Sequence, residues 1–182
     1  MDLSRRSRDR GFTLIELLVV VAIIGIIAVI LIPNLLDALQ KAKQKRTMAT
    51  LRDVGTDWLS WMTDEVSSAA AGAGGAGLFS YESLEVISAE DLGALLVPED
   101  GVRYASDVPK RDSWAHPLEY AWSENMKSAS TGLAIRSFGR DGEEGPTAPP
   151  YPMGPFQVTE YAEDIVWSDG FFVRYPAGAK MQ

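Results

Sequence analysis

The chain has 182 residues, a hydrophobic content of 46% and a formal net charge of −8. This acidic balance argues against a protein that coats nucleic acid, because such proteins carry a basic patch or stripe. The absence of cysteine excludes disulfides, thiolate metal sites and cysteine nucleophiles, and a single histidine, His116, nearly excludes a zinc site built from histidines.

The N-terminus combines a basic leader with a long apolar segment. Residues 1–10 contain four arginines and two aspartates, and the 21 residues Phe12–Ile32 contain one charged residue, Glu16. A helix of this length is about 32 Å long, which matches the hydrocarbon thickness of a bilayer. We therefore expect one membrane-spanning helix over residues 12–32.

Glu16 is unusual in this segment. A carboxylate in lipid costs about 2.5–3.5 kcal/mol at the centre of a helix and less near its end. Either Glu16 lies near the interface and reaches out to water, or it pairs with a cation inside the membrane.

Basic residues lie on both sides of the apolar segment, since Lys41, Lys43, Lys45 and Arg46 follow it. The positive-inside rule therefore supports both orientations almost equally, and we favour a cytoplasmic N-terminus because its arginines lie nearer the segment. The cluster 41–46 could be a solvated face, a membrane-surface anchor or a charge partner between subunits, with the solvated or anchoring role as the default.

The helical pattern continues beyond the apolar segment. Pro33 removes a backbone donor, so we expect a kink or local melting there. Apolar residues then recur every three or four positions, which predicts an amphipathic helix over residues 33–65 whose apolar stripe covers a sheet. The stripe consists of Leu35, Leu36, Leu39, Ala42, Leu51, Val54, Trp58, Trp61 and Met62.

Residues 66–182 form the expected globular part. A stretch rich in glycine and alanine at 67–77 predicts a loop, and Ser88 begins a short helix that ends at Pro98. A turn at Ser168-Asp169-Gly170 joins the last two expected strands. The sequence thus predicts an α+β fold, with the long helix packed on a small antiparallel sheet. The expected strands are Leu118–Trp122, Leu133–Phe138, Ile165–Trp167 and Phe171–Tyr175.

The string Gly11-Phe12-Thr13-Leu14-Ile15-Glu16, between the basic leader and the apolar helix, resembles the processing site of type IV prepilins and type II secretion pseudopilins. The resemblance implies that a prepilin peptidase removes residues 1–11 by cleavage after Gly11 and N-methylates Phe12. It also implies that Glu16 pairs with the N-terminal amine of a neighbouring subunit during filament assembly, and that the helix near Pro33 can loosen in the filament.

A string in the globular part resembles major type II secretion pseudopilins. Residues 112–120 are similar to the segment D-x-W-G-x-P-x-x-Y, with Ala115 in place of the glycine and His116 in place of an asparagine. The implied role is structural, with Trp114 and Tyr120 packed inward. His116 is expected in a turn or at the surface.

A second string, Ser137–Gly142, resembles the S-x-G-x-D-G loop of the same pseudopilins, and the Asp164-Ile165 pair resembles the segment that closes it. In that family the loop binds calcium, which prefers six to eight oxygen ligands. The resemblance therefore assigns Asp141 and Asp164 as calcium ligands. The loop 141–164 is longer here and carries five prolines, and a solvated acidic loop is the alternative. Further candidate ligands are Glu143, Glu144 and Glu163.

The resemblance implies a structural filament subunit and not an enzyme: a major pseudopilin that polymerises into the periplasmic pseudopilus of a type II secretion system. Its implied partners are further copies, minor pseudopilins, the prepilin peptidase and an inner-membrane assembly platform, without nucleic acid. It would be anchored in the inner membrane by a single span, with its globular part in the periplasm.

Two alternatives remain. A major or minor type IV pilin of a surface pilus carries the same N-terminal signal, although many such pilins close a C-terminal loop with a disulfide that this chain cannot form. A membrane-anchored enzyme would need a polar catalytic constellation, and the globular part offers only scattered carboxylates and one histidine.

Overall fold

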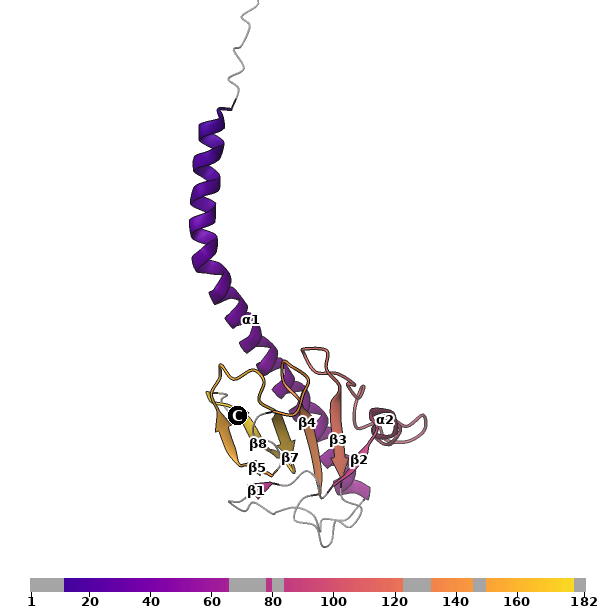
Figure 1. The fold of residues 1–182 in the computed structure, drawn as a ribbon. Coiled ribbons are helices and arrows are strands. Elements are labelled where there is room, and N and C mark those ends of the chain that lie inside the picture. Colours follow the sequence, from indigo (N-terminus) through magenta and orange to yellow (C-terminus); the bar gives the residue numbers. More distant parts are fainter. Residues whose placement is uncertain (1–11, 66–77, 80–83, 123–131, 146–149, 179–182) are drawn as a thin grey trace, which may run out of the picture. The chain divides into compact units, whose positions relative to one another are not determined.

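The computed structural model describes residues 12–65, 78–79, 84–122, 132–145 and 150–178 (Figure 1). The expected leader, with Gly11, and the expected loop at 67–77 lie outside these residues. The chain divides into two compact units, residues 1–39 and residues 40–182. The second unit is called the head below.

One helix, α1 (Leu14–Glu65), contains both predicted helical segments. The helix is continuous through Pro33, so local melting is absent from the free chain. The Asn34 side chain donates a hydrogen bond to the Ile30 carbonyl at 3.3 Å, one residue beyond the proline. Loosening at Pro33 on assembly stays a prediction.

The head contains a six-stranded sheet in the order β2-β3-β4-β7-β8-β6. Neighbouring strands are antiparallel except for β6 and β8, which pair in parallel, so the sheet is mixed where an antiparallel one was expected. The strands are β2 (Glu85–Ile87), β3 (Leu118–Trp122), β4 (Leu133–Ser137), β6 (Gly154–Phe156), β7 (Ile165–Ser168) and β8 (Phe171–Pro176). A separate pair comprises β1 (Leu78–Phe79) and β5 (Tyr151–Pro152), and the short helix is α2 (Ala89–Leu96).

The predicted turn at residues 168–170 joins β7 to β8 as an antiparallel hairpin. Asp169 has φ 46° and Gly170 has φ 98°, and two positive φ values in succession suit the right-handed twist of a tight hairpin. The Asp169 carboxylate also accepts hydrogen bonds from the backbone amides of Gly132 and Leu133 at about 3 Å. The aspartate thus fixes both the turn and the start of β4.

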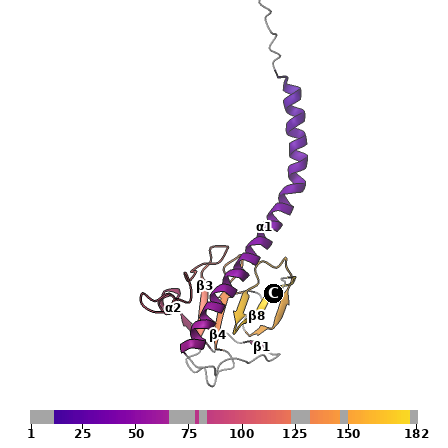
Figure 2. The same cartoon turned by 180° about the vertical axis from the view of Figure 1, so that it is seen from behind.

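The core of the head lies between the C-terminal part of α1 and one face of the sheet (Figure 2). Trp58 and Trp167 are both fully buried there, and Trp58 meets Tyr120 edge to face at 6.3 Å. Gly55 allows α1 to approach Trp167 of β7 closely, since a Cβ at this position would lie 2.4 Å from the Trp167 ring. The helix residues in this core are Met48, Leu51, Val54, Trp58 and Met62.

Only the later residues of the predicted apolar stripe of α1 are buried in the core of the head. Leu51, Val54, Trp58 and Met62 are buried, and Trp61 is partly buried. Leu35, Leu36, Leu39 and Ala42 are exposed and are not part of that core. A long helix packed on a small sheet is nevertheless the α+β arrangement expected, and it is consistent with a type IV pilin-like fold.

Candidate functional site

The N-terminal end of α1 is closed by a reciprocal pair of side chains. Thr13 precedes the helix, and its hydroxyl accepts a hydrogen bond from the Glu16 backbone amide at 3.3 Å. Glu16 Oε2 in turn accepts from the Thr13 amide at 2.9 Å and from the Thr13 hydroxyl at 2.7 Å. This is a capping box, which satisfies otherwise unpaired amides, and a carboxylate in the first turn also suits the helix dipole.

The first part of α1 exposes an almost unbroken apolar surface. Large apolar side chains between Phe12 and Leu39 are exposed, most of them by half or more. Among the described residues α1 is long and apolar enough to cross a membrane by length and composition, and it is compatible with a single-pass inner-membrane anchor. A surface of this kind requires lipid or other apolar helices around it.

Asp164, one of the two predicted calcium ligands, lies fully buried directly before β7. Its Oδ1 accepts a hydrogen bond from the Gly145 amide at 3.0 Å, and its Oδ2 accepts from the Tyr151 hydroxyl. Burial raises the pKa of Asp164 to about 6, although the Tyr151 and Gly145 hydrogen bonds and the charge of Arg136 act in the opposite direction.

Arg136, the fourth residue of β4, is the cation of this buried group. One guanidinium nitrogen donates to Glu144 Oε1 and to the Tyr151 hydroxyl, each at 2.9 Å, and the other donates to Glu119 Oε2 at 2.9 Å. The chain Arg136–Tyr151–Asp164 therefore joins β4 to the middle and the end of the loop 141–164, and Glu144 adds a contact near its start. We call these five residues, including the two glutamates, the Arg136 network.

The other acidic residues of the loop are dispersed. Asp141, the second predicted ligand, is exposed and accepts a hydrogen bond from the Glu143 amide at 3.4 Å. Glu163 is buried and forms an ion pair with Arg174 of β8 at 3.0 Å. Asp141 and Asp164 accept hydrogen bonds from different partners among the described residues, Asp141 from Glu143 and Asp164 from Gly145 and Tyr151.

This donor set does not fit a calcium ion as it is arranged. Calcium needs six to eight oxygens around one point, and the two oxygens of Asp164 already accept protein hydrogen bonds. No group of three or more histidine, cysteine, aspartate or glutamate side chains suitable for a metal is found among the described residues. Calcium binding stays a prediction from the resemblance.

The segment 112–120 connects the loop to α1. Asp112 Oδ1 accepts from the amides of Trp114 and His116, and its Oδ2 accepts from the Ser137 hydroxyl at 2.7 Å. The Trp114 indole donates to Gln40 Oε1 of α1 at 2.7 Å. Tyr120 is buried as expected, and its hydroxyl donates to the Pro109 carbonyl.

His116 has a structural contact that the sequence did not indicate. Its Nε2 lies 3.0 Å from the Arg140 carbonyl, and its ring lies against Gly142, where a Cβ would approach within 2.3 Å. The two strings that resemble pseudopilins, 112–120 and 137–142, are therefore packed together. Ala115 beside it has φ 72°, a conformation that glycine adopts more easily.

Sequence reasoning missed Arg136 and Tyr151. The available signal was an arginine that directly follows the apolar residues Leu133, Ala134 and Ile135 of a predicted strand. In the structure all five residues of β4 are buried. The alternation of strands would place such an arginine in solvent, and only the loop folded over that face makes it a buried cation.

Comparison with known families gives one match. A family described as the prokaryotic N-terminal methylation motif matches residues 6–32. No curated protein and no solved structure matches the chain. The matched residues contain the second half of the basic leader, Gly11, Phe12 and Glu16. The chain therefore carries the prepilin methylation motif of type IV pilin-like proteins at its N-terminus, which implies processing by a prepilin peptidase and polymerisation into filaments.

Proposed function

We propose that the chain is a major pseudopilin, the structural subunit of the periplasmic pseudopilus of a type II secretion system. The observation that carries the proposal is the exposed apolar surface of α1 directly behind a prepilin methylation motif. Lipid can cover this surface in the single subunit, and the same surface on other copies can replace the lipid in a filament. Assembly, and not catalysis, is the activity.

Processing prepares the N-terminus for assembly. Cleavage after Gly11 removes the basic leader and makes Phe12 the terminal residue, which is then N-methylated. The new amine is positive and lies four residues before Glu16 in sequence. In the filament, the Glu16 carboxylate pairs with the amine of a neighbouring subunit, so that neither charge is left alone among apolar helices.

The proposed domains follow from this division of labour. Residues 12–32 form the filament core, residues 33–65 carry the helix into the head, and residues 66–182 form the periplasmic surface. Minor pseudopilins and an inner-membrane platform would start and drive polymerisation. The loop 141–164 is part of the outer surface in this arrangement.

A type IV pilin of a surface pilus is the second candidate. The matched motif at residues 6–32 is common to both kinds of subunit. The Arg136 network also weakens the specific pseudopilin argument, because the loop that resembles a calcium site uses its buried carboxylate for protein hydrogen bonds. Electron microscopy of cells that express the chain separates the candidates, since long surface filaments would favour a pilin.

The experiment on Glu16 tests the filament proposal. Glu16→Leu should abolish filaments while the head folds normally, because the intersubunit pair is lost. Thr13→Val is the matched control: it removes the hydroxyl of the capping box but leaves the carboxylate, so filaments should persist. Mass spectrometry of the mature wild-type protein should show a methylated Phe12 at the terminus. Unprocessed protein, or normal filaments from Glu16→Leu, would contradict the proposal.

A further inference from the structure

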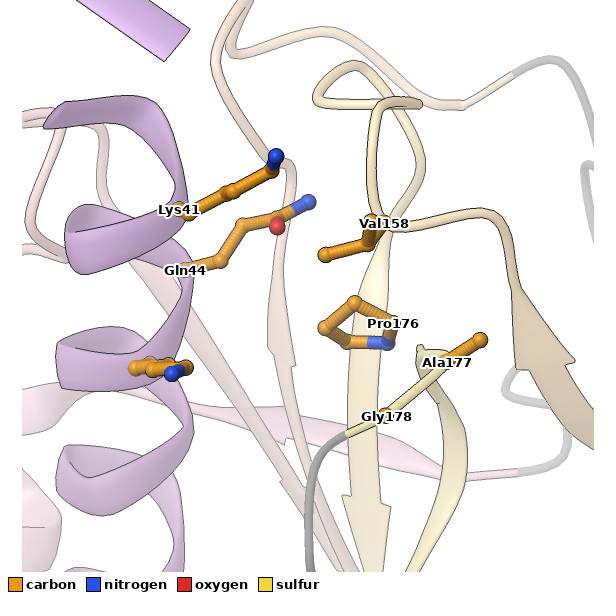
Figure 3. A pocket seen from close by; sticks show the side chains of 7 residues that line it. Lys41, Gln44, Val158, Pro176, Ala177 and Gly178 are labelled. Atoms are coloured by element: carbon orange, nitrogen blue, oxygen red, sulfur yellow. The ribbon is translucent and has the colours of Figure 1, made fainter. Parts of the chain in front are cut away.

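A cavity of about 270 Å³ lies in the head between α1 and the end of β8 (Figure 3). Basic and amide side chains of α1 form one wall, and small apolar groups form the other. The first wall consists of Lys41, Gln44 and Lys45, and the second includes Val158, Pro176 and Ala177. The cavity therefore offers hydrogen-bond donors on one side and apolar contact on the other.

Gln44 is the unusual residue of this cavity. Only 2% of it is exposed, and its Oε1 has no hydrogen-bond partner within the part of the chain that the structure describes. Figure 3 shows its amide extended into the cavity beside Lys41, toward Val158. A buried amide without a partner is unfavourable, so an occupant that hydrogen-bonds it is favoured. Rotation of the amide can present either its oxygen or its nitrogen to that occupant.

The lining defines the chemistry of the occupant. The positive charges of the lysine side chains favour an anionic occupant, and lysine is well suited to phosphate as a compact positive charge. The Gln44 oxygen requires a donor such as a hydroxyl. A phosphate that carries a hydroxylated substituent satisfies both, whereas a headgroup with its own ammonium would be repelled by the lysines.

The position along α1 indicates the source of this phosphate. The exposed apolar surface of the helix ends at Leu39, and Lys41 follows two residues later, a rise of about 3 Å. Basic residues at the end of a lipid-exposed helix lie at the level of phospholipid headgroups.

We propose that this cavity binds the headgroup of an anionic phospholipid, with the phosphate against Lys41 and Lys45 and a headgroup hydroxyl against Gln44. The site goes beyond the filament role proposed above. It holds the head of an unassembled subunit at the membrane surface.

Native mass spectrometry of the full chain in mild detergent, titrated with phosphatidylglycerol, tests the site. Lys45→Gln and Lys43→Gln remove the same charge from the same helix, but only Lys45 lines the cavity. We expect Lys45→Gln to bind phosphatidylglycerol at least fivefold more weakly than Lys43→Gln. Equal losses in the two variants would overturn the proposal, because diffuse charge alone would explain them.

Two further measurements separate the other occupants. Gln44→Met keeps the size of the side chain and should remove the preference for phosphatidylglycerol over phosphatidylcholine, and its tryptophan signal reports whether the head is folded. Inorganic phosphate that binds as tightly as the lipid, with the same dependence on Lys45, would overturn the lipid source. A Lys45→Gln defect confined to self-association would overturn it also, in favour of a carboxylate from a second copy.

Discussion

Replacing Arg136 by methionine should lower the free energy of unfolding of the head by about 3 kcal/mol. Removing one partner of a buried ion pair typically costs about 3–5 kcal/mol. The lower end applies here because the side chains of Glu119 and Glu144 are 22% and 51% exposed and regain water when the arginine is removed. The lost hydrogen bond to Tyr151 contributes about 1 kcal/mol of the total.

Thermal unfolding of the full chain in detergent measures this change. All five tryptophans lie between residues 58 and 167, so their signal reports on the head and not on the apolar part of α1. A loss of about 3 kcal/mol corresponds to a melting temperature lower by about 6–12 °C for a unit of this size. Glu144→Gln is the control, since it removes only the half-exposed partner and should cost less than about 1 kcal/mol.

Two results would refute the reasoning. If Arg136→Met costs no more than Glu144→Gln, the arginine does not hold the loop in place. The other result is that a calcium chelator lowers the melting temperature of the wild type by as much as the Arg136 substitution does. In that case the loop depends on a bound metal, and the Asp164 hydrogen bonds are not those of the calcium-bound head.

Three further predictions concern the same region. Because the pKa of Asp164 is raised from 3.8 to about 6, the native state binds its proton more tightly, and the head should lose about 2 kcal/mol as the pH rises from about 4 to 6. Asp164→Asn should remove this difference in urea unfolding at the two pH values. Ala115→Gly should raise the free energy of unfolding by about 1 kcal/mol, because φ 72° strains an alanine, and an unchanged midpoint in the same assay would contradict this. If calcium does bind as the resemblance implies, calcium should raise the melting temperature and Asp141→Ala should abolish that rise; no shift at millimolar calcium would remove the expectation.

The sequence predicted the elements that are long or locally specified. The four predicted strands appear within one residue of their expected ends, and α1 ends at Glu65 as expected. These elements have strong periodicity or a clear turn. The structure also contains β1, β2, β5 and β6, of two or three residues each, which the sequence did not predict. Prolines in β5 and β6 argue against strands, and both form only because a partner strand from elsewhere in the chain pairs with them.

The candidate site was predicted where the motif is contiguous and missed where it is assembled from distant residues. The processing motif occupies one short string, so a family comparison finds it directly. The Arg136 network joins residues separated by up to 45 positions, from Glu119 to Asp164, and no local pattern records that separation. The alternation of β4 could not show that both faces of the strand are covered.

The capping box of Thr13 and Glu16 has a consequence for the supply of subunits. Glu16 already accepts hydrogen bonds from Thr13 in the single chain, so the carboxylate of an unassembled subunit in the bilayer is not without donors. Pairing with a neighbour then exchanges these local hydrogen bonds for an ion pair, so the gain from the Glu16 pair is smaller than it would be for a carboxylate without donors. A filament built on such an exchange can shorten as well as grow, and the membrane can serve as a reservoir of reusable monomers.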